Sequence, residues 1–174
     1  MTDQEFLITE LENGIGMHNP MFKELARLSV ELIKDLEVKT VLDYGAGTGV
    51  YSDAFHKAGY DVKAFEIFRA HREYMREHVP HIQIFNKPIT TDLLFFMETA
   101  EHMTDKELDY LFAQIKPNYI FFSSTSEVTD KDKEWGHINL KSQDAWDLFF
   151  MCNGYTKVRD LTLPTSWSKL YKIY

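Results

Sequence analysis

The sequence predicts an α/β protein with a largely parallel sheet, helices on both faces of the sheet and an antiparallel hairpin at the carboxyl end. Apolar runs of strand length alternate with segments of helical periodicity, which is typical of α/β folds. A glycine-rich turn joins the first apolar run to the helix that follows it. Residues 155–163 and 167–174 alternate between apolar and polar positions around a Pro-Thr-Ser turn, which favours a hairpin.

The expected elements follow in chain order. A helix with an apolar stripe begins at Pro20, a residue that suits a first helical turn, and continues to about residue 36. Further helices are expected at residues 50–58, 68–78, 106–115 and 143–152. Strands are expected at residues 40–44, 61–65, 82–85, 92–97 and 119–122, before the hairpin.

Capping residues support these boundaries. Thr104 with Glu107 reads as a capping box, and Ser142 is a good N-cap for the helix after it. Gly59 and Gly154 stand where helices are expected to end. Residues 1–19 are polar and acidic, and we expect them to be flexible or to fold over a ligand site.

Composition predicts one soluble domain over residues 1–174. The net charge of −8 disfavours broad, non-specific binding of nucleic acid. No apolar run approaches a membrane span and the amino end lacks a signal-peptide pattern, so a cytoplasmic protein is expected. Cys152 is the only cysteine, which excludes an internal disulfide, and its apolar surroundings predict a packed side chain.

The most informative segment is VLDYGAGTGVY, residues 41–51. Glycine has no Cβ, so a tight strand-to-helix turn can bring its backbone close to a ligand. The N–H groups at the start of the next helix would favour a carboxylate or phosphate. A dinucleotide motif, G-x-G-x-x-G or G-x-G-x-x-A, would need glycine or alanine where Val50 stands. The pattern therefore argues against a nicotinamide-dependent oxidoreductase.

The pattern D-x-G-x-G-x-G in this segment resembles motif I of the class I S-adenosylmethionine-dependent methyltransferases. The segment DLLFFMETAEH, residues 92–102, is similar to the fourth-strand motif of the same family. This resemblance extends from Pro20 to Tyr174 and implies a Rossmann-like methyltransferase fold. It implies that Asp43 orients the turn and the methionine amino group, while the glycine backbone carries the methionine part of the cofactor.

Glu66 ends the second expected strand, where a carboxylate can accept hydrogen bonds from two ribose hydroxyls. The resemblance places Ile67 beside the adenine and Met97 near the sulfonium. Many members of the family have an acid after the third strand that contacts the adenine amino group, and this chain departs from that pattern. Asn86 is the nearest polar residue there, and its amide can make a similar contact. The cofactor-binding residues expected in total are Asp43, Gly45, Ala46, Gly47, Gly49, Glu66, Ile67, Asn86 and Met97.

A second group of polar residues follows the fourth expected strand. Glu98, Glu101 and His102 have the spacing E-x-x-E-H, and they would share one face if this segment were helical. With His137 they could bind a divalent metal such as Mg, Mn or Zn, as in the metal-dependent subset of the family. Alternatively, Glu98, His102 and His137 act as catalytic groups, or the histidines are structural. The other helix and turn histidines, expected to be exposed, are His56, His71, His78 and His81.

These features predict an enzyme that transfers a methyl group from S-adenosylmethionine to an acceptor. A hydroxyl-bearing small molecule is favoured over nucleic acid because the chain is acidic. The chain has no long insertion between strands. Either the acceptor site is therefore open and takes a large substrate, or it is closed by a partner protein, a second copy of the chain or the N-terminal segment. The alternative is a non-catalytic module or partner subunit that keeps the fold and binds the cofactor.

Overall fold

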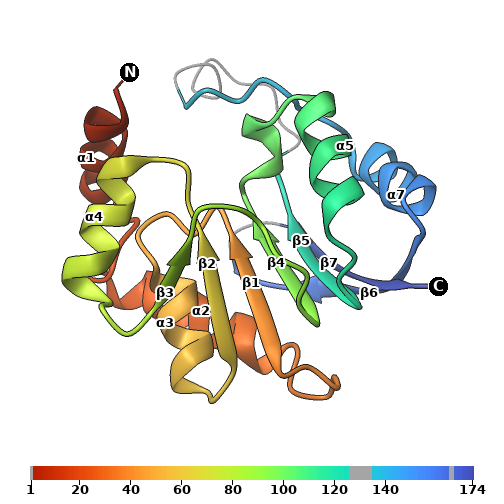
Figure 1. Ribbon diagram of the computed structural model, residues 1–174, viewed down its shortest axis with the longest axis horizontal. Helices are drawn as coiled ribbons and strands as arrows, with labels where there is room; N and C mark the ends of the chain where they lie inside the picture. The colour runs from red at the N-terminus through yellow and green to blue at the C-terminus, as the bar shows by residue number, and fades with distance from the viewer. Residues whose placement is uncertain (1, 126–134, 165–166) are drawn as a thin grey trace. The chain divides into compact units, whose positions relative to one another are not determined.

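The computed structural model describes residues 2–125, 135–164 and 167–174. Its strands are ordered β3-β2-β1-β4-β5-β7-β6, mostly parallel with an antiparallel hairpin at the carboxyl end (Figure 1). The predicted α/β class is confirmed. Contacts divide the chain into two compact units, Met1–Pro88 and Ile89–Tyr174, which we describe separately.

The first unit carries a parallel sheet built around a central strand. β1 pairs with β2 so that Thr40 lies opposite Asp61, and β2 pairs with β3 so that Lys63 lies opposite Gln83. Its elements are α1 (Asp3–Glu12), α2 (Pro20–Glu31), β1 (Thr40–Tyr44), α3 (Val50–Lys57), β2 (Asp61–Phe65), α4 (Arg69–His78) and β3 (Gln83–Phe85).

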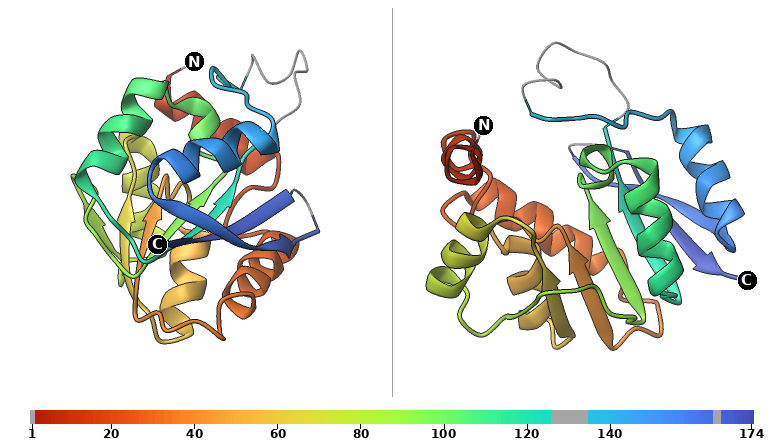
Figure 2. Two further views of the ribbon diagram at one scale, coloured as in Figure 1. Left: turned by 90° about the vertical axis from the view of Figure 1, so that its right-hand side faces the viewer. Right: turned by 45° about the horizontal axis from the view of Figure 1, so that its top comes forward.

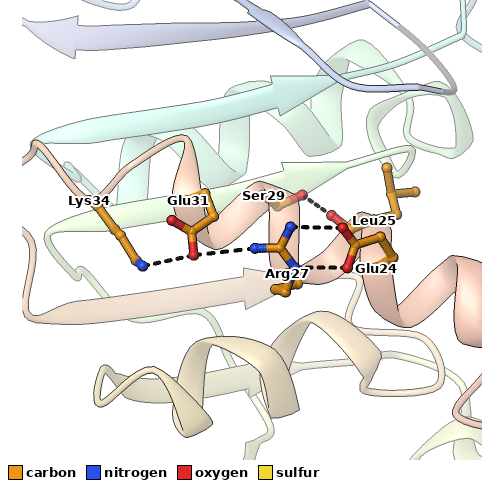
Figure 3. Close-up of polar contacts among 6 residues, drawn as sticks. All are labelled: Glu24, Leu25, Arg27, Ser29, Glu31 and Lys34. Atoms are coloured by element: carbon orange, nitrogen blue, oxygen red, sulfur yellow. Dashed lines mark hydrogen bonds and ion pairs between the residues drawn. The ribbon is translucent and has the colours of Figure 1, made fainter.

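Helix α2 begins at Pro20 as predicted, and the Asn19 side chain accepts a hydrogen bond from the Met21 N–H at 3.0 Å. It ends earlier than predicted, at Glu31. Exposed ion pairs lie along the helix and just after it: Arg27 binds Glu24 at 2.7 Å, and Lys34, three residues beyond the last residue of α2, binds Glu31 at 2.7 Å (Figure 3). Such exposed pairs are screened by water, so they add little stability.

Helix α1 is not among the predicted elements. A capping box starts it: the Thr2 hydroxyl accepts from the Glu5 N–H, and the Glu5 carboxylate accepts from the Thr2 N–H. Only Leu7 is buried in this helix, so its sequence lacks the wide apolar stripe that identifies a helix from sequence alone.

The second unit carries the buried strand β4 beside β5, with Leu93 opposite Tyr119 in parallel. β5 then pairs antiparallel with β7, which forms the predicted hairpin with β6. Its elements are β4 (Leu93–Met97), the 3₁₀ turn η1 (Ala100–His102), α5 (Asp105–Gln114), β5 (Tyr119–Ser123), α7 (Gln143–Cys152), β6 (Tyr155–Thr162) and β7 (Trp167–Ile173).

The predicted caps of this unit are confirmed. Thr104 and Glu107 form the capping box of α5, and the Ser142 hydroxyl accepts from the Ala145 N–H at the start of α7.

Two predictions about side-chain burial are wrong. Cys152 is exposed at the end of α7, and His71 is only 1% exposed. No helix within the described ranges is long and apolar enough to cross a bilayer.

Candidate functional site

The glycine-rich turn after β1 is bound to the end of β2 in the first unit. The Gly45 and Ala46 N–H groups both donate to the carbonyl oxygen of Phe65, at 2.9 and 3.0 Å. Gly45, Gly47 and Gly49 have φ values of 77°, 53° and 81°, in the left-handed region that favours glycine. This is the tight strand-to-helix turn that the sequence predicts.

Glu66 holds the same turn through its side chain. One carboxylate oxygen accepts from the Gly47 N–H and the other from the Phe68 N–H, each at 2.8 Å. The residue is 6% exposed, and burial raises the pKa of its carboxyl although the two backbone N–H groups act in the opposite direction. A carboxylate oxygen has more than one acceptor site, so Glu66 keeps capacity for further hydrogen bonds.

Asp43 lies beneath the turn and is 2% exposed. Its carboxylate accepts a hydrogen bond from the Ser52 hydroxyl at 2.6 Å, which connects the end of β1 to α3. Burial raises the pKa of Asp43 to about 7; the hydrogen bond from Ser52 opposes this shift and the negative charge of Glu66 adds to it. Two acids therefore lie close to one turn, an arrangement that would favour a positively charged group nearby.

The glycines of the turn differ in what surrounds them. A Cβ on Gly47 would meet only the Gly45 carbonyl oxygen, at 4.0 Å, so the space beside it is open. A Cβ on Gly49 would lie 2.9 Å from Val79 and 3.1 Å from Met75, which belong to a buried core cluster. Gly47 thus has room for a ligand, whereas Gly49 permits close packing of the helix start.

The remaining expected cofactor residues lie at strand ends. Ile67, 65% exposed, follows β2, and Asn86, also exposed, follows β3, the strand paired with β2. Met97 is the half-buried last residue of β4, in the second unit. The first unit thus brings Asp43, the glycine turn and Glu66 together and places Ile67 directly after them.

The second unit contains a cluster of one acid and two histidines. The rings of His102 and His137 lie 4.7 Å apart between centroids. One ligand atom from each of Glu101, His102 and His137 can be chosen so that all three lie within 4.8 Å of one another. The backbone carbonyl of Glu101 accepts from the Ile138 and Asn139 N–H groups, at 2.8 and 2.9 Å, which holds the His137 segment beside η1.

The protonation of this cluster follows from its burial. Burial and the neighbouring His137 lower the pKa of His102 to about 4, so its imidazole is neutral at pH 7. Burial and the negative charge of Glu98 raise the pKa of Glu101 well above its usual value. One oxygen of Glu101 accepts from the Ser124 hydroxyl at 2.9 Å, while the other is buried without a hydrogen-bond partner.

Glu98 is arranged differently from the sequence expectation. The only helical turn here is the 3₁₀ turn of residues 100–102, so Glu98 does not share a helix face with Glu101 and His102. Instead it has a φ of 45°, its N–H donates to the Ser123 carbonyl, and its carboxylate accepts from the Ser123 hydroxyl. The condition for a common face, a helix that includes Glu98, is therefore not met, because the chain bends directly after β4.

Sequence reasoning missed three serines, Ser52, Ser123 and Ser124. Their hydroxyls donate to the carboxylates of Asp43, Glu98 and Glu101, respectively. The signal for two of them was present, because small polar residues directly follow the buried apolar run of β5. In a parallel sheet such residues lie at the carboxyl edge of the strands, where ligands bind in open α/β folds.

Comparison with known proteins identifies the family of this chain. Residues 16–160 match the family model described as a methyltransferase domain. Among proteins with curated descriptions, none matches the sequence significantly.

Solved structures share the fold at low sequence identity. The PH0226 protein from Pyrococcus horikoshii OT3 is 16% identical, with 87% of this chain and 90% of that chain covered and a TM-score of 0.64. CalS10, an amino pentose methyltransferase from Micromonospora echinaspora, is 12% identical, with 90% and 92% covered and a TM-score of 0.66. A SAM dependent methyltransferase from Archaeoglobus fulgidus is 12% identical, with 97% and 99% covered and a TM-score of 0.68. Since the family model matches most of the chain, this protein belongs to the methyltransferase domain family, within the class I superfamily that its glycine motif resembles.

Proposed function

We propose that this protein transfers a methyl group from S-adenosylmethionine to a hydroxyl group of a small molecule. The observation that carries the proposal is the hydrogen bond from the Gly47 N–H to the buried Glu66 carboxylate. Gly47 itself has open space beside it. The structure of CalS10 is described as SAM bound, which supports the same cofactor here.

In the proposed complex, the methionine part lies along the backbone of residues 45–47, with its ammonium group near Asp43. The ribose hydroxyls donate to Glu66, and Ile67 and Asn86 flank the adenine. A fixed bound geometry matters because methyl transfer from a sulfonium depends mainly on aligning nucleophile, methyl and sulfur. In the reaction an oxygen–carbon bond forms, the sulfur–carbon bond breaks, and the hydroxyl proton passes to a base.

We assign the proton acceptor to the group formed by Glu98, His102 and His137. The lowered pKa keeps the His102 imidazole neutral at pH 7, so it can accept a proton, but a pKa of about 4 makes it a weaker base than an ordinary histidine. A small acceptor is favoured because the net charge of −8 opposes binding of a polyanion.

We also propose that the cluster of Glu101, His102 and His137 can bind a divalent cation. The donor set fits, because Glu101 has a buried oxygen without a hydrogen-bond partner, and one ligand atom from each of Glu101, His102 and His137 lies within 4.8 Å of the others. One carboxylate and two imidazoles suit Zn or Mn better than Mg, which prefers oxygen ligands. When bound, such an ion would supply Lewis acidity toward a hydroxyl.

Isothermal titration calorimetry with S-adenosylhomocysteine and with NAD tests the cofactor. We expect the first ligand to bind and the second to give no heat. Binding of NAD alone would refute the proposal. Cofactor binding without methyl transfer to any compound in a panel of small alcohols, phenols and sugars would instead favour the non-catalytic module.

The affinity for S-adenosylhomocysteine is expected to fall below neutral pH. Asp43 must be ionised to bind the ammonium group, and its pKa in the free protein is about 7. Lowering the pH from 7.5 to 6 protonates it, so the affinity should drop roughly three- to tenfold. Asp43→Asn should remove most of this dependence and leave the smaller part due to Glu66, whose pKa is also raised. An equal slope in both proteins would exclude Asp43 from the ammonium contact.

Addition of Zn²⁺ or Mn²⁺ is expected to raise the melting temperature of the protein, because a ligand that binds only the folded state stabilises it. His137→Ala should abolish the increase by removing one of the three donors. His78→Ala is the matched control, since His78 is exposed on α4 in the other unit. Differential scanning calorimetry checks this, and equal increases in the two variants would contradict a metal site at His137.

A further inference from the structure

Helix α1 contacts the amino end of α4 at three points, and Figures 1 and 2 show the two helices side by side. The Asp3 carboxylate accepts from the Ala70 N–H at 3.2 Å. The Phe6 ring lies 5.5 Å from the Phe68 ring and 5.8 Å from the His71 ring, measured between centroids. These contacts hold the segment that directly follows Glu66.

Asp3 supplies a cap that α4 lacks in its own sequence. The N-cap residue of α4 is Phe68, whose side chain cannot accept a hydrogen bond. The first N–H groups of a helix need acceptors, and a carboxylate is a favourable one. The cap of α4 therefore comes from a residue 67 positions earlier in the chain.

The third contact is a buried ion pair or hydrogen bond between His71 and Glu10. His71 Nε2 lies 2.6 Å from a carboxylate oxygen of Glu10, and the Glu10 side chain is only 14% exposed. The other ring nitrogen of His71, Nδ1, is buried without a hydrogen-bond partner. Loss of Glu10 would leave both nitrogens of a buried ring unpaired, which is costly.

These contacts adjoin the carboxylate expected to bind ribose. Glu66 accepts from the Phe68 N–H, and the Arg72 guanidinium donates to the backbone carbonyls of Glu66 and Ile67. His71 lowers and Glu10 raises the pKa of Glu66, so their charges offset in part. The main effect of the pair on Glu66 is therefore its placement rather than its charge.

We infer that α1 is a positioning element of the cofactor site: Asp3, Phe6 and Glu10 hold the amino end of α4, and thereby keep the Glu66 carboxylate on the Gly47 and Phe68 N–H groups. The identity of the ligand, S-adenosylmethionine, rests on the proposed function. The arrangement of α1, α4 and Glu66 rests on the contacts above and can be tested without ligand.

The test compares Glu10→Ala with the matched control Glu12→Ala in the full chain. Both changes place alanine in α1, but Glu12 is exposed whereas Glu10 binds the buried His71. In the ligand-free protein, Glu10→Ala should speed hydrogen exchange of the Gly47 and Phe68 amides. Exchange of the Asp53 amide, which donates to the Gly49 carbonyl within α3, should stay unchanged.

The second readout is the dissociation constant for S-adenosylhomocysteine, measured by calorimetry. Glu10→Ala should weaken binding roughly three- to tenfold, and Glu12→Ala should bind like the parent protein. Glu10→Gln keeps an oxygen acceptor for His71 and should restore part of the affinity. In a Glu66→Gln background the loss caused by Glu10→Ala should shrink, because both changes act through the same carboxylate.

The outcomes separate this inference from the proposed function. Unchanged exchange at Gly47 and Phe68 in Glu10→Ala, or equal affinities in Glu10→Ala and Glu12→Ala, overturns the positioning role. Selective acceleration of those two amides in a protein that does not bind S-adenosylhomocysteine supports the positioning role and refutes the proposed cofactor. Should Glu10→Ala fail to fold, Asp3→Ala, which removes only the cap, takes its place with the same expected results.

Discussion

Glu66→Gln is expected to weaken binding of S-adenosylhomocysteine by ~1–3 kcal/mol, measured by isothermal titration calorimetry. The change removes the negative charge of the carboxylate that, in the proposed complex, accepts hydrogen bonds from the ribose hydroxyls. It also replaces one acceptor oxygen by an NH₂ group, which cannot accept from the Gly47 or Phe68 N–H. Both effects reduce the affinity for S-adenosylhomocysteine. The turn loses a hydrogen bond that holds it in place, and the ligand loses a charged acceptor for its hydroxyls.

A control variant isolates the site effect from a general loss of charge. Glu77→Gln removes an exposed carboxylate from α4 in the same unit and should leave the affinity unchanged. If Glu66→Gln bound S-adenosylhomocysteine as tightly as Glu77→Gln, the ribose would have to lie elsewhere.

Gly49→Ala is expected to lower the free energy of unfolding by ~2–5 kcal/mol, the largest effect on stability among these predictions. A part of this loss is the strain of placing a Cβ on a residue with φ of 81°. The larger part is the collision of that Cβ with Val79 and Met75, which lie in a packed cluster and cannot move away freely.

Gly59→Ala separates the two contributions. Gly59 has a φ of 95°, but a Cβ placed on it meets nothing within 4 Å. It should cost only the backbone strain, ~1–2 kcal/mol. Urea unfolding of both variants gives the comparison through the shift in midpoint at constant slope. Equal losses would show that Gly49 is required for its backbone conformation alone.

The parts of the fold that the sequence predicts well are those set by local chemistry. The turn after β1 follows from three glycines, and the start of α5 follows from the pair Thr104 and Glu107. The buried strand β4 follows from five apolar residues in a row. In each case one short segment contains both the signal and its physical cause.

The failures involve residues whose partners are distant in the chain. Helix α1 is amphipathic only weakly, and its contacts with α4 join residues more than sixty positions apart. His71 was expected to be exposed, like the other histidines on helices and turns. Yet His71 and Met75 are four positions apart in α4, on the face that is buried, and this spacing is a signal that His71 faces the interior.

The backbone at Glu98 could not be inferred from sequence for a different reason. The spacing E-x-x-E-H suits one face of an α-helix, but the chain instead takes a left-handed backbone conformation at Glu98 and only then forms a 3₁₀ turn. Nothing in the local sequence demands this, because a positive φ at a non-glycine residue requires contacts elsewhere to hold it. Here the N–H and carboxylate of Glu98 are bound by Ser123, at the end of another strand.

The lone exposed thiol at Cys152 gives the protein a natural attachment point for a spectroscopic probe. A maleimide dye or nitroxide would react there without competing cysteines, on the last turn of α7. A second thiol introduced at the exposed position 77 would complete a donor–acceptor pair spanning both units. Energy transfer between the two labels would then report whether a ligand changes the distance between the two labelled positions.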